Sequence, residues 1–228
     1  MSVLAFVAAE RRELEGILSR AAGLASLRWP VEFAREFVLN GQAAVAVANG
    51  PGPKLAGCAL DAIRERREIR AVVSVGYCGA LKRELDANDI AVATRVNNRA
   101  TRTPQVSRAF AAGPVVSVDR VVTSLEEKSG LARTGAIAVE MEAEALAERA
   151  ESWGVPFYCV RIVTDTADEA LPLDFNALRD ADGRFQRSRI LLAALRRPGV
   201  LAPRLMRLDR RCRDASAVLG DFIADCRF

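Results

Sequence analysis

Histidine is absent from the 228 residues of this sequence. Its absence excludes the Ser-His and Cys-His pairs that activate nucleophiles in many hydrolases, and it removes the commonest protein ligand of metal ions. Acid and base chemistry in this protein therefore has to come from carboxyl groups. The five cysteines are an odd number and form no C-x-x-C pair, so we expect neither a disulfide framework nor a metal site.

Long apolar segments are also missing. The longest run without a charged residue, 37–53, is interrupted by asparagine, glycine and proline, which is unlike a membrane-spanning helix. The apolar residues 2–9 are too few for a secretory signal and are followed directly by the charged residues 10–13. We therefore expect a cytoplasmic protein.

The amino acids that are present suit one compact domain with a basic end. Half of the residues are hydrophobic, which is enough to build a substantial core in a chain of this length. Residues 184–228 carry eleven arginines and four aspartates, whereas residues 1–183 have a net charge of −3. We expect an α/β domain over residues 1–183, followed by an arginine-rich helical extension over residues 184–228 that packs on or beside it.

Apolar runs and helical periodicities alternate along the first part of the chain. Strands are expected at 2–9, 37–39, 43–48, 71–75, 90–96, 115–118, 136–139 and 157–163, and helices at 10–22, 54–66 and 142–152. Asn40-Gly41 predicts a tight hairpin turn, and the strand-loop-helix-strand order from 43 to 75 predicts a parallel pair. The alternation predicts a single α/β domain with a mixed central sheet flanked by helices.

The C-terminal region has a purely helical pattern, which we expect to begin at Arg184. Its apolar residues are spaced by three and four positions: Leu205, Leu208, Cys212, Ala215, Leu219 and Phe222. This spacing predicts an amphipathic helix whose opposite face is basic.

Two glutamates interrupt the apolar segment 138–143, whose sequence is AVEMEA. Strand alternation places Glu140 and Glu142 on the same face, and a carboxylate with two acceptor oxygens suits the adjacent hydroxyl groups of a ribose. The alternative interpretation is that the acids only favour the N-terminus of the following helix.

Three further segments are candidates for a site. Thr164-Asp165 ends a predicted strand, at the sheet edge where open α/β folds bind ligands, although an aspartate there can also cap the next segment. The segment 75–80 (VGYCGA) brings two glycines that allow close approach to a ligand, or that form a tight turn. Residues 50–54 (GPGPK) match neither a P-loop nor a dinucleotide-binding loop, which argues against nucleoside triphosphates and NAD.

Together, these four segments resemble the purine nucleoside and uridine phosphorylase superfamily, and within it the methylthioadenosine/S-adenosylhomocysteine nucleosidase branch. The resemblance covers about residues 1–180. It implies a nucleoside phosphorylase-like fold that cleaves the N-glycosidic bond of a purine nucleoside without a bound cofactor. Asp165, which follows Thr164, would be the catalytic acid at purine N7.

The same resemblance implies the ribose site. Glu142 would bind the 2′- and 3′-hydroxyls, Met141 would pack on the sugar, and Glu140 would lie beside the base or sugar. A glutamate that orders the attacking water is expected after the first strand, and Glu13 fits this position better than Glu10, one helical turn earlier.

Two segments match the family with departures. The segment 76–81 (GYCGAL) is similar to the motif G-[ST]-A-G-G-[LI] near the ribosyl group, which implies contacts from Gly76, Tyr77 and Cys78, with Tyr77 replacing a small residue. Asp119 begins a segment that resembles the wall around the base. Val121 and Val122 would line it, and Val121 replaces an aromatic residue.

The sequence leaves hydrolysis and phosphorolysis open. A phosphate co-substrate needs a cationic or amide-rich cradle, for which Arg11, Arg12, Lys54 and the loop 50–52 are candidates. The alternative is that these basic side chains are solvated surface groups.

Two differences from the nucleosidase branch bear on the group attached to the 5′ carbon of the nucleoside. The chain is short between Val96 and Val115, and its tail is rich in arginine. Both features resemble the hopanoid-associated phosphorylase subgroup, which implies adenosylhopane, a nucleoside linked to a large lipid. The alternatives are methylthioadenosine/S-adenosylhomocysteine and futalosine nucleosidases.

The same features predict which partners this protein binds. The basic amphipathic helix can contact anionic lipid headgroups at the membrane, or simply pack on its own domain. A homodimer is expected by resemblance to the nucleosidase branch. A different class of function is a non-catalytic nucleoside-binding protein whose basic tail contacts a membrane or nucleic acid. We do not expect nucleic acid, because the tail has few aromatic residues for stacking.

Overall fold

The structure is a computed structural model that describes residues 2–186, 188, 192, 195 and 199–228. Its strands are β1 Val3–Ala8, β2 Ala22–Ser26, β3 Phe33–Leu39, β4 Gln42–Ala48, β5 Ile69–Ala80, β6 Ile90–Val96, β7 Arg99–Ala100, β8 Ala111–Ser117, β9 Ala138–Glu140 and β10 Phe157–Asp165. Its helices are α1 Arg11–Leu18, α2 Pro53–Arg64, α3 Leu125–Ala132, α4 Ala143–Ser152 and α6 Leu201–Asp225, with a 3₁₀ turn η1 Asn176–Leu178.

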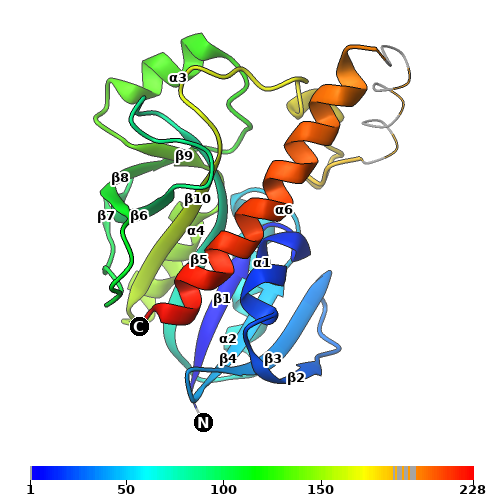
Figure 1. The fold of residues 1–228 in the computed structure, drawn as a ribbon. Coiled ribbons are helices and arrows are strands. Elements are labelled where there is room, and N and C mark those ends of the chain that lie inside the picture. Colours follow the sequence, from blue (N-terminus) through cyan, green and yellow to red (C-terminus); the bar gives the residue numbers. More distant parts are fainter. Residues whose placement is uncertain (1, 187, 189–191, 193–194, 196–198) are drawn as a thin grey trace.

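The strands form one mixed ten-stranded sheet in the order β10-β6-β8-β9-β5-β1-β4-β3-β2, and β7 pairs with β6 (Figure 1). The long strand β5 also pairs in parallel with β10, so that β5, β10, β6, β8 and β9 close on themselves at one end of the sheet. The predicted α/β architecture with a mixed central sheet, flanking helices and a C-terminal helix is therefore confirmed.

Strand β1 shows why the sheet has two covered faces. All six of its residues are buried, and they alternate between two hydrophobic clusters. Val3, Ala5 and Val7 face α2 and α4 in the first cluster, whereas Leu4 and Phe6 face α1 and α6 in the second. A strand that is apolar at every position is typical of a sheet with helices on both sides.

Several predicted elements are confirmed. The Asn40-Gly41 hairpin joins β3 to β4 with positive φ at both residues, 50° and 76°, as a tight turn of this type requires. Strands 90–96 and 157–163 and helices 54–66 and 142–152 are present, with ends shifted by a few residues.

Three structural predictions were wrong in detail. The helix expected at 10–22 ends at Leu18, because the following residues form β2, which pairs with the edge of β3. The strands 43–48 and 71–75 have the same direction but are not neighbours, since β1 lies between them and pairs with both. Helix does not begin at Arg184, because Phe185 bridges to Arg179. Ser188, Leu192 and Leu195 are helical, the rest of 187–198 lies outside the described residues, and α6 begins at Leu201.

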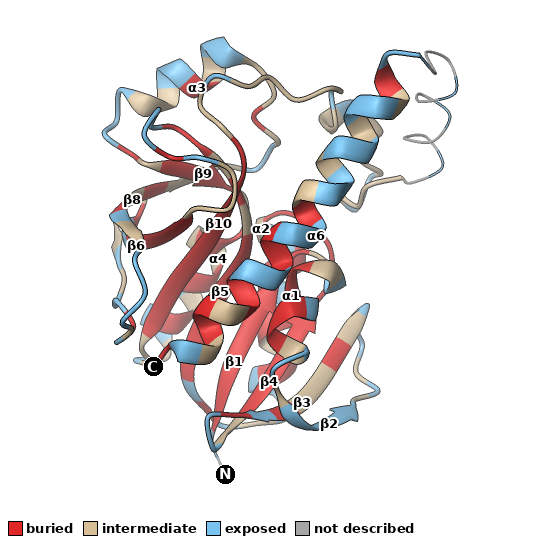
Figure 2. Ribbon diagram, in the orientation of Figure 1, coloured by how far each residue is buried: buried red, intermediate tan, exposed pale blue. Residues whose placement is uncertain are grey.

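Helix α6 is buried over its C-terminal half and exposed over its N-terminal half, as Figure 2 shows. Of its predicted apolar stripe, Cys212, Ala215, Leu219 and Phe222 are buried. The basic N-terminal half carries the exposed Met206. No helix in the described ranges is both long and apolar enough to span a membrane.

The helices α1 and α6 cross in direct backbone contact. A Cβ atom added to Gly220 would lie 2.2 Å from the carbonyl carbon of Gly16, and one added to Gly16 would lie 1.7 Å from the carbonyl oxygen of Ser216. The hydroxyl of Ser216 accepts from the amide of Gly16 at 3.0 Å and donates to the carbonyl of Arg12 at 2.7 Å. Glycine at both positions therefore sets the distance between the two helices.

The close approach of α1 and α6 leads to a prediction about the stability of the protein. Gly220→Ala should lower the free energy of unfolding by ~2 kcal/mol or more, because the added methyl group forces α1 and α6 apart. Gly130→Ala is the matched control, since a Cβ there meets nothing within 4 Å on α3, and it should leave stability equal or slightly higher. Urea denaturation of both variants measures the difference, and equal stability would contradict the close crossing.

Candidate active site

A cavity of about 840 Å³ opens where β1, β5, β9 and β10 end, beneath α1 and α6. It gathers side chains that are far apart in the sequence. The predicted site residues that line it are Arg11, Arg12, Glu13, Tyr77, Cys78, Val121, Val122, Glu140, Met141, Glu142, Thr164 and Asp165. Of the remaining predicted residues, Gly76 lies just behind the wall and Lys54 lies in a neighbouring hollow.

Asp165 is the last residue of β10 and is buried at the floor of the cavity. The Thr164 hydroxyl donates to its Oδ1 at 3.1 Å, and the ammonium group of Lys128 donates to its Oδ2 at 2.5 Å. Burial raises the pKa of Asp165, and the charge of Lys128 opposes that rise. A buried carboxyl group with a raised pKa is suited to donate a proton.

Sequence analysis missed Lys128. The side chain comes from α3 and is only 1% exposed, although α3 is otherwise a largely exposed helix. Helical periodicity could not reveal it, because α3 has no apolar face. The one usable signal is composition, since the sequence has only three lysines against thirty arginines.

Glu13 lies in the first turn of α1 and turns its carboxylate inward. Its Oε2 accepts from the backbone amide of Glu10 at 2.7 Å, and its Oε1 accepts from the amide of Tyr77 at 2.9 Å. Burial raises the pKa of Glu13, while these two hydrogen bonds lower it. Glu10, the alternative candidate, pairs instead with Arg12 at 2.8 Å, so Glu13 is the better placed of the two.

Gly76 makes room for this carboxylate rather than contacting the cavity itself. Its φ is 149°, and a Cβ there would lie 2.6 Å from Oε1 of Glu13 and 2.7 Å from Nη1 of Arg161. Any side chain would push the two charged groups away. The glycine of this motif is therefore required by packing beneath the cavity.

Arg161 is a second residue that sequence analysis missed. Its guanidinium is 1% exposed and contacts the carboxylate of Glu140, the hydroxyl of Ser74 at 2.7 Å and, at 3.8 Å, the carboxylate of Glu142. A signal was present, because Arg161 is the sole charged residue in the apolar strand 157–163. A charge inside a buried strand needs a partner, and the partners here are site carboxylates.

The two glutamates of the AVEMEA segment have different tasks. Glu140 accepts from the backbone amides of Glu142 and Ala143, both at 2.9 Å, and from Arg161. Its side chain is fully covered, so it holds the N-terminus of α4 and the guanidinium in place. The helix-terminus interpretation therefore describes Glu140, whose oxygens are already engaged.

Glu142 keeps one oxygen for the cavity. Its Oε1 accepts from the amide of Gly52 at 2.8 Å, whereas Oε2 has only the distant contact with Arg161. Burial, and after it the charge of Glu140, raises the pKa of Glu142 to about 8. The neighbouring Met141 lines the cavity with its side chain partly exposed.

Tyr77 connects the cavity wall to α6. Its hydroxyl donates to the carbonyl of Cys212 at 2.8 Å, and the guanidinium of Arg12 lies 5.8 Å from the centre of its ring. On the opposite wall, the side chain of Asn176 binds both the amide and the carbonyl of Val121 at 2.8 Å. Tyr77, which stands where the resembling motif has a small residue, thus attaches the C-terminal helix to the cavity wall.

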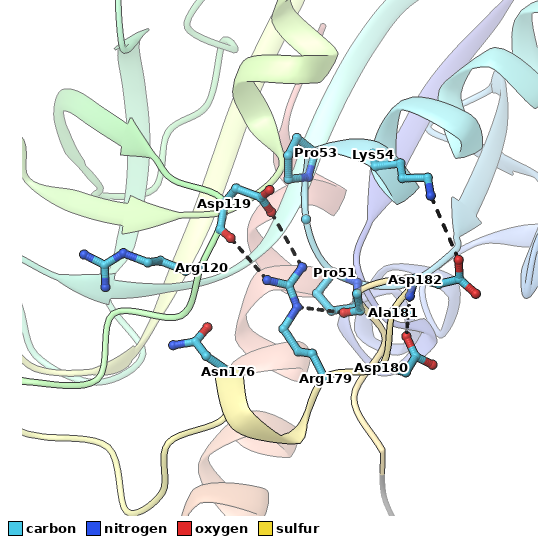
Figure 3. A pocket seen from close by; sticks show the side chains of 12 residues that line it. Pro51, Pro53, Lys54, Asp119, Arg120, Asn176, Arg179, Asp180, Ala181 and Asp182 are labelled. Carbon is cyan, nitrogen blue, oxygen red and sulfur yellow. Dashed lines mark hydrogen bonds and ion pairs between the residues drawn. The ribbon is translucent and has the colours of Figure 1, made fainter.

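The cationic candidates for a phosphate site are divided between two hollows, since Arg11 and Arg12 line the cavity and Lys54 does not. Arg11 is exposed and pairs with Glu15 at 3.4 Å, and Arg12 pairs with Glu10 and, at 3.7 Å, with Asp209. Lys54 points away from the cavity toward Asp182, 4.0 Å away, in an adjacent hollow of about 450 Å³ (Figure 3). Within the described ranges, no group of three acidic or cysteine side chains is arranged to hold a metal ion.

The raised pKa of Glu142 predicts how stability depends on pH. The folded protein holds the Glu142 proton up to about pH 8, whereas the unfolded chain releases it near pH 4.5, so the free energy of unfolding falls as pH rises through this window. Glu142→Gln removes the titration and keeps the acceptor for Gly52. Its stability relative to wild type should therefore rise from pH 5 to pH 8, by up to ~1.4 kcal/mol per pH unit.

Urea denaturation at several pH values measures this difference. Glu84→Gln, at an exposed position outside the cavity, is the control and should show a constant difference. A constant difference for Glu142→Gln as well would show that Glu142 is ionised at neutral pH in the folded protein.

Comparisons with known proteins agree with this fold. A family model described as Phosphorylase superfamily matches residues 99–196. The 5′-methylthioadenosine/S-adenosylhomocysteine nucleosidase of Staphylococcus aureus (strain JH9) is 24% identical, over 61% of this chain and 76% of the relative.

Two solved structures cover nearly the whole chain. The 5′-methylthioadenosine/S-adenosylhomocysteine nucleosidase of Neisseria meningitidis, in complex with methylthio-immucillin-A, has a TM-score of 0.73 at 20% identity, covering 99% of this chain and 98% of that one. The futalosine hydrolase of Helicobacter pylori strain 26695 has a TM-score of 0.71 at 17% identity, with 97% and 95% covered. The predicted nucleoside phosphorylase-like fold is confirmed.

Proposed function

We propose that this chain is an enzyme of the phosphorylase superfamily and that it hydrolyses the N-glycosidic bond of a purine nucleoside that carries an apolar group on its 5′ carbon. The observation that carries the proposal is the single cavity into which Glu13, Glu142 and Asp165 project from three separate elements. The relatives support the purine, since they include a methylthioadenosine/S-adenosylhomocysteine nucleosidase and a futalosine hydrolase.

The chemistry divides among the three carboxyl groups. When the bond between C1′ and N9 breaks, the electron pair stays with the purine and positive charge develops on the ribose. Asp165 donates a proton to N7, so the base leaves as a neutral molecule, and this kind of acid catalysis contributes ~10²–10⁴-fold. Water adds to C1′ and gives its proton to Glu13, as a paired carboxylate does in glycosidases.

Glu142 binds the sugar in this proposal. Its Oε2 accepts no hydrogen bond within the described part of the chain and is available to the 2′- and 3′-hydroxyls. Arg161 contacts the carboxylates of both Glu140 and Glu142 and lies beside Glu13 across Gly76. It therefore holds the sugar-binding and water-ordering groups at a fixed separation.

The charge of the cavity favours water over phosphate as the nucleophile. Glu10, Glu13 and Glu15 line the side where the nucleophile would enter, and Arg12 is already neutralised by Glu10 and Asp209. The amides of Gly52 and Tyr77, which could bind an anion, donate instead to the two glutamates of the site. A dianion placed here would meet the repulsion of these carboxylates, although Nε of Arg12 donates no hydrogen bond within the described part of the chain.

The apolar part of the cavity wall indicates the 5′ substituent. With Asp165 at the base and Glu142 at the ribose, the rest of the wall includes the large apolar side chains of Leu171, Phe175, Phe185 and Leu208. Phe175 and Phe185 stack edge to face at 6.0 Å. These side chains suit a thioether or alkyl group, as in methylthioadenosine.

Adenosylhopane is a second candidate substrate, and one specific observation supports it. The basic N-terminal half of α6 stands free of the domain beside this apolar wall, with Met206 70% exposed, as a helix that approaches anionic lipid would require. Membrane contact through α6, like a homodimer, stays a prediction.

The purine-cleavage proposal is tested with purified variants. Asp165→Asn and Glu13→Gln should each lower kcat by ~10²-fold or more while the fold is kept, because the proton donor or the water-ordering base is lost. Release of free purine from methylthioadenosine, S-adenosylhomocysteine, futalosine and a 5′-alkylated adenosine is followed by chromatography. Asp182→Asn, in the neighbouring hollow, is the matched control and should keep full activity. If the wild-type protein releases no purine from any of them, the purine-cleavage proposal is wrong.

The choice of nucleophile is tested separately. We expect the rate of purine release to be independent of inorganic phosphate and the sugar product to be the free sugar, because Glu10 and Asp209 already pair with Arg12 and further carboxylates line this side of the cavity. Formation of a sugar 1-phosphate that depends on phosphate would establish phosphorolysis instead.

A further inference from the structure

Lys128 is the buried cation next to the proposed proton donor. Its ammonium group has three hydrogens and three acceptors: Oδ2 of Asp165 at 2.5 Å, the carbonyl of Thr166 at 2.6 Å and the carbonyl of Glu169 at 3.0 Å. All of its donors are therefore occupied inside the protein. Lys128 has no hydrogen left for a substrate, so any part it plays in the reaction acts through Asp165.

The contacts of Lys128 join three separate parts of the chain. The residue lies on α3, Asp165 ends β10, and Thr166 and Glu169 belong to the loop that leaves the cavity floor. The carboxylate of Glu169 in turn pairs with Arg211 of α6 at 2.5 Å. The Asp165 carboxyl group is thus tied through the ammonium of Lys128 to α3 and to the following loop.

The two oxygens of Asp165 have different surroundings. Oδ2 accepts from Lys128, and a Cβ on Gly79 would lie 2.8 Å from it, whereas Oδ1 is contacted by the hydroxyl of Thr164. The other titratable groups that face Asp165 are Glu169 from the following loop and the buried thiol of Cys78 from β5. Lys128 is the one cation in direct contact with it among the described residues.

We propose that Lys128 is a positioning residue, which binds Oδ2 of Asp165 so that the proton is carried on Oδ1 and which stabilises the carboxylate once that proton has moved to the purine. The inference rests on the proposed function. In the step, the O–H bond of Asp165 breaks, an N7–H bond forms, and the electron pair of the C1′–N9 bond goes to the base. Lys128 keeps its own three hydrogens throughout.

The physical reason lies in the burial of the pair. An aspartate that has lost its proton in this dry environment would be an uncompensated charge, which is strongly unfavourable. The ammonium at 2.5 Å compensates the charge at the moment it forms. The same contact lowers the pKa of Asp165, which burial raises.

The test is the pH dependence of purine release by Lys128→Met, a side chain of similar length without charge. The limb of the kcat profile that falls as pH rises, where Asp165 loses its proton, should move up by about one pH unit or more. The plateau below it should drop roughly tenfold to hundredfold. KM should stay within about threefold, because Lys128 does not touch the substrate.

Lys82→Met is the matched control, the same substitution at an exposed position outside the cavity, and should leave the profile unchanged. If Lys128→Met lowers kcat but its falling limb stays at the wild-type pH, Lys128 is only structural and the inference is overturned. Unchanged activity overturns it as well. If Lys128→Met does not fold, Lys128→Gln carries the same expectation, since its amide still donates to the two carbonyls.

A double variant separates this inference from the proposed function. In an Asp165→Asn background, Lys128→Met should cause no further loss of activity, because both residues act through one proton. An additional loss there would show that Lys128 acts by another route. Failure of the wild-type protein to release any purine would refute the proposed function itself, whereas an altered or unaltered pH profile bears on Lys128 alone.

Discussion

The site depends on one buried guanidinium. Arg161 stands beneath the cavity with Glu140 and Glu142 on one side and Glu13 on the other. With Lys128 it makes two buried cations, against the four buried carboxyl groups of Glu13, Glu140, Glu142 and Asp165. Two charges cannot balance four in a dry environment, so protons have to make up the difference. Burial raises the pKa of Glu13, Glu142 and Asp165, while Arg161 opposes that rise at the two glutamates and Lys128 opposes it at Asp165.

The same balance explains why the protein can do without histidine. The proton donor at physiological pH is usually a histidine in its imidazolium form, because carboxyl groups ordinarily ionise far below neutrality. Burial together with the neighbouring carboxylates lifts the pKa of Glu142 to about 8, and burial also lifts that of Asp165. Carboxyl groups can therefore hold protons at neutral pH here, at the cost of a fold that is less stable than one with an apolar floor.

The sequence predicted the parts of the molecule whose signals are local. Asn40-Gly41, the apolar strands and the AVEMEA segment each carry their information within a few residues, and the structure has a turn, strands and a helix start at those places. The neighbours of β1 were not predictable, because strand order depends on pairing between distant segments. The same reason applies to Lys128, whose partner Asp165 is 37 positions away and on another element.

Glu140 and Glu142 show which properties of a sequence motif can be predicted and which cannot. Alternation placed them on one face, and both do line the cavity. Their separate tasks depend on α4 and Arg161, since the helix amides and the guanidinium take both oxygens of Glu140. A single residue between them, Met141, changes the backbone from strand to helix, and that change decides which carboxylate remains for a ligand.

Helix α6 makes the arginine-rich region an integral part of the fold. Its C-terminal half fills the second hydrophobic cluster with Ala215, Leu219 and Phe222, and its middle closes the cavity with Leu208 and Cys212. The helix can approach α1 so closely because both helices have a glycine at the crossing. Glu13 and the wall formed by α6 therefore move as one unit. The free basic half begins where this packing ends, so whatever it contacts is held directly beside the mouth of the cavity.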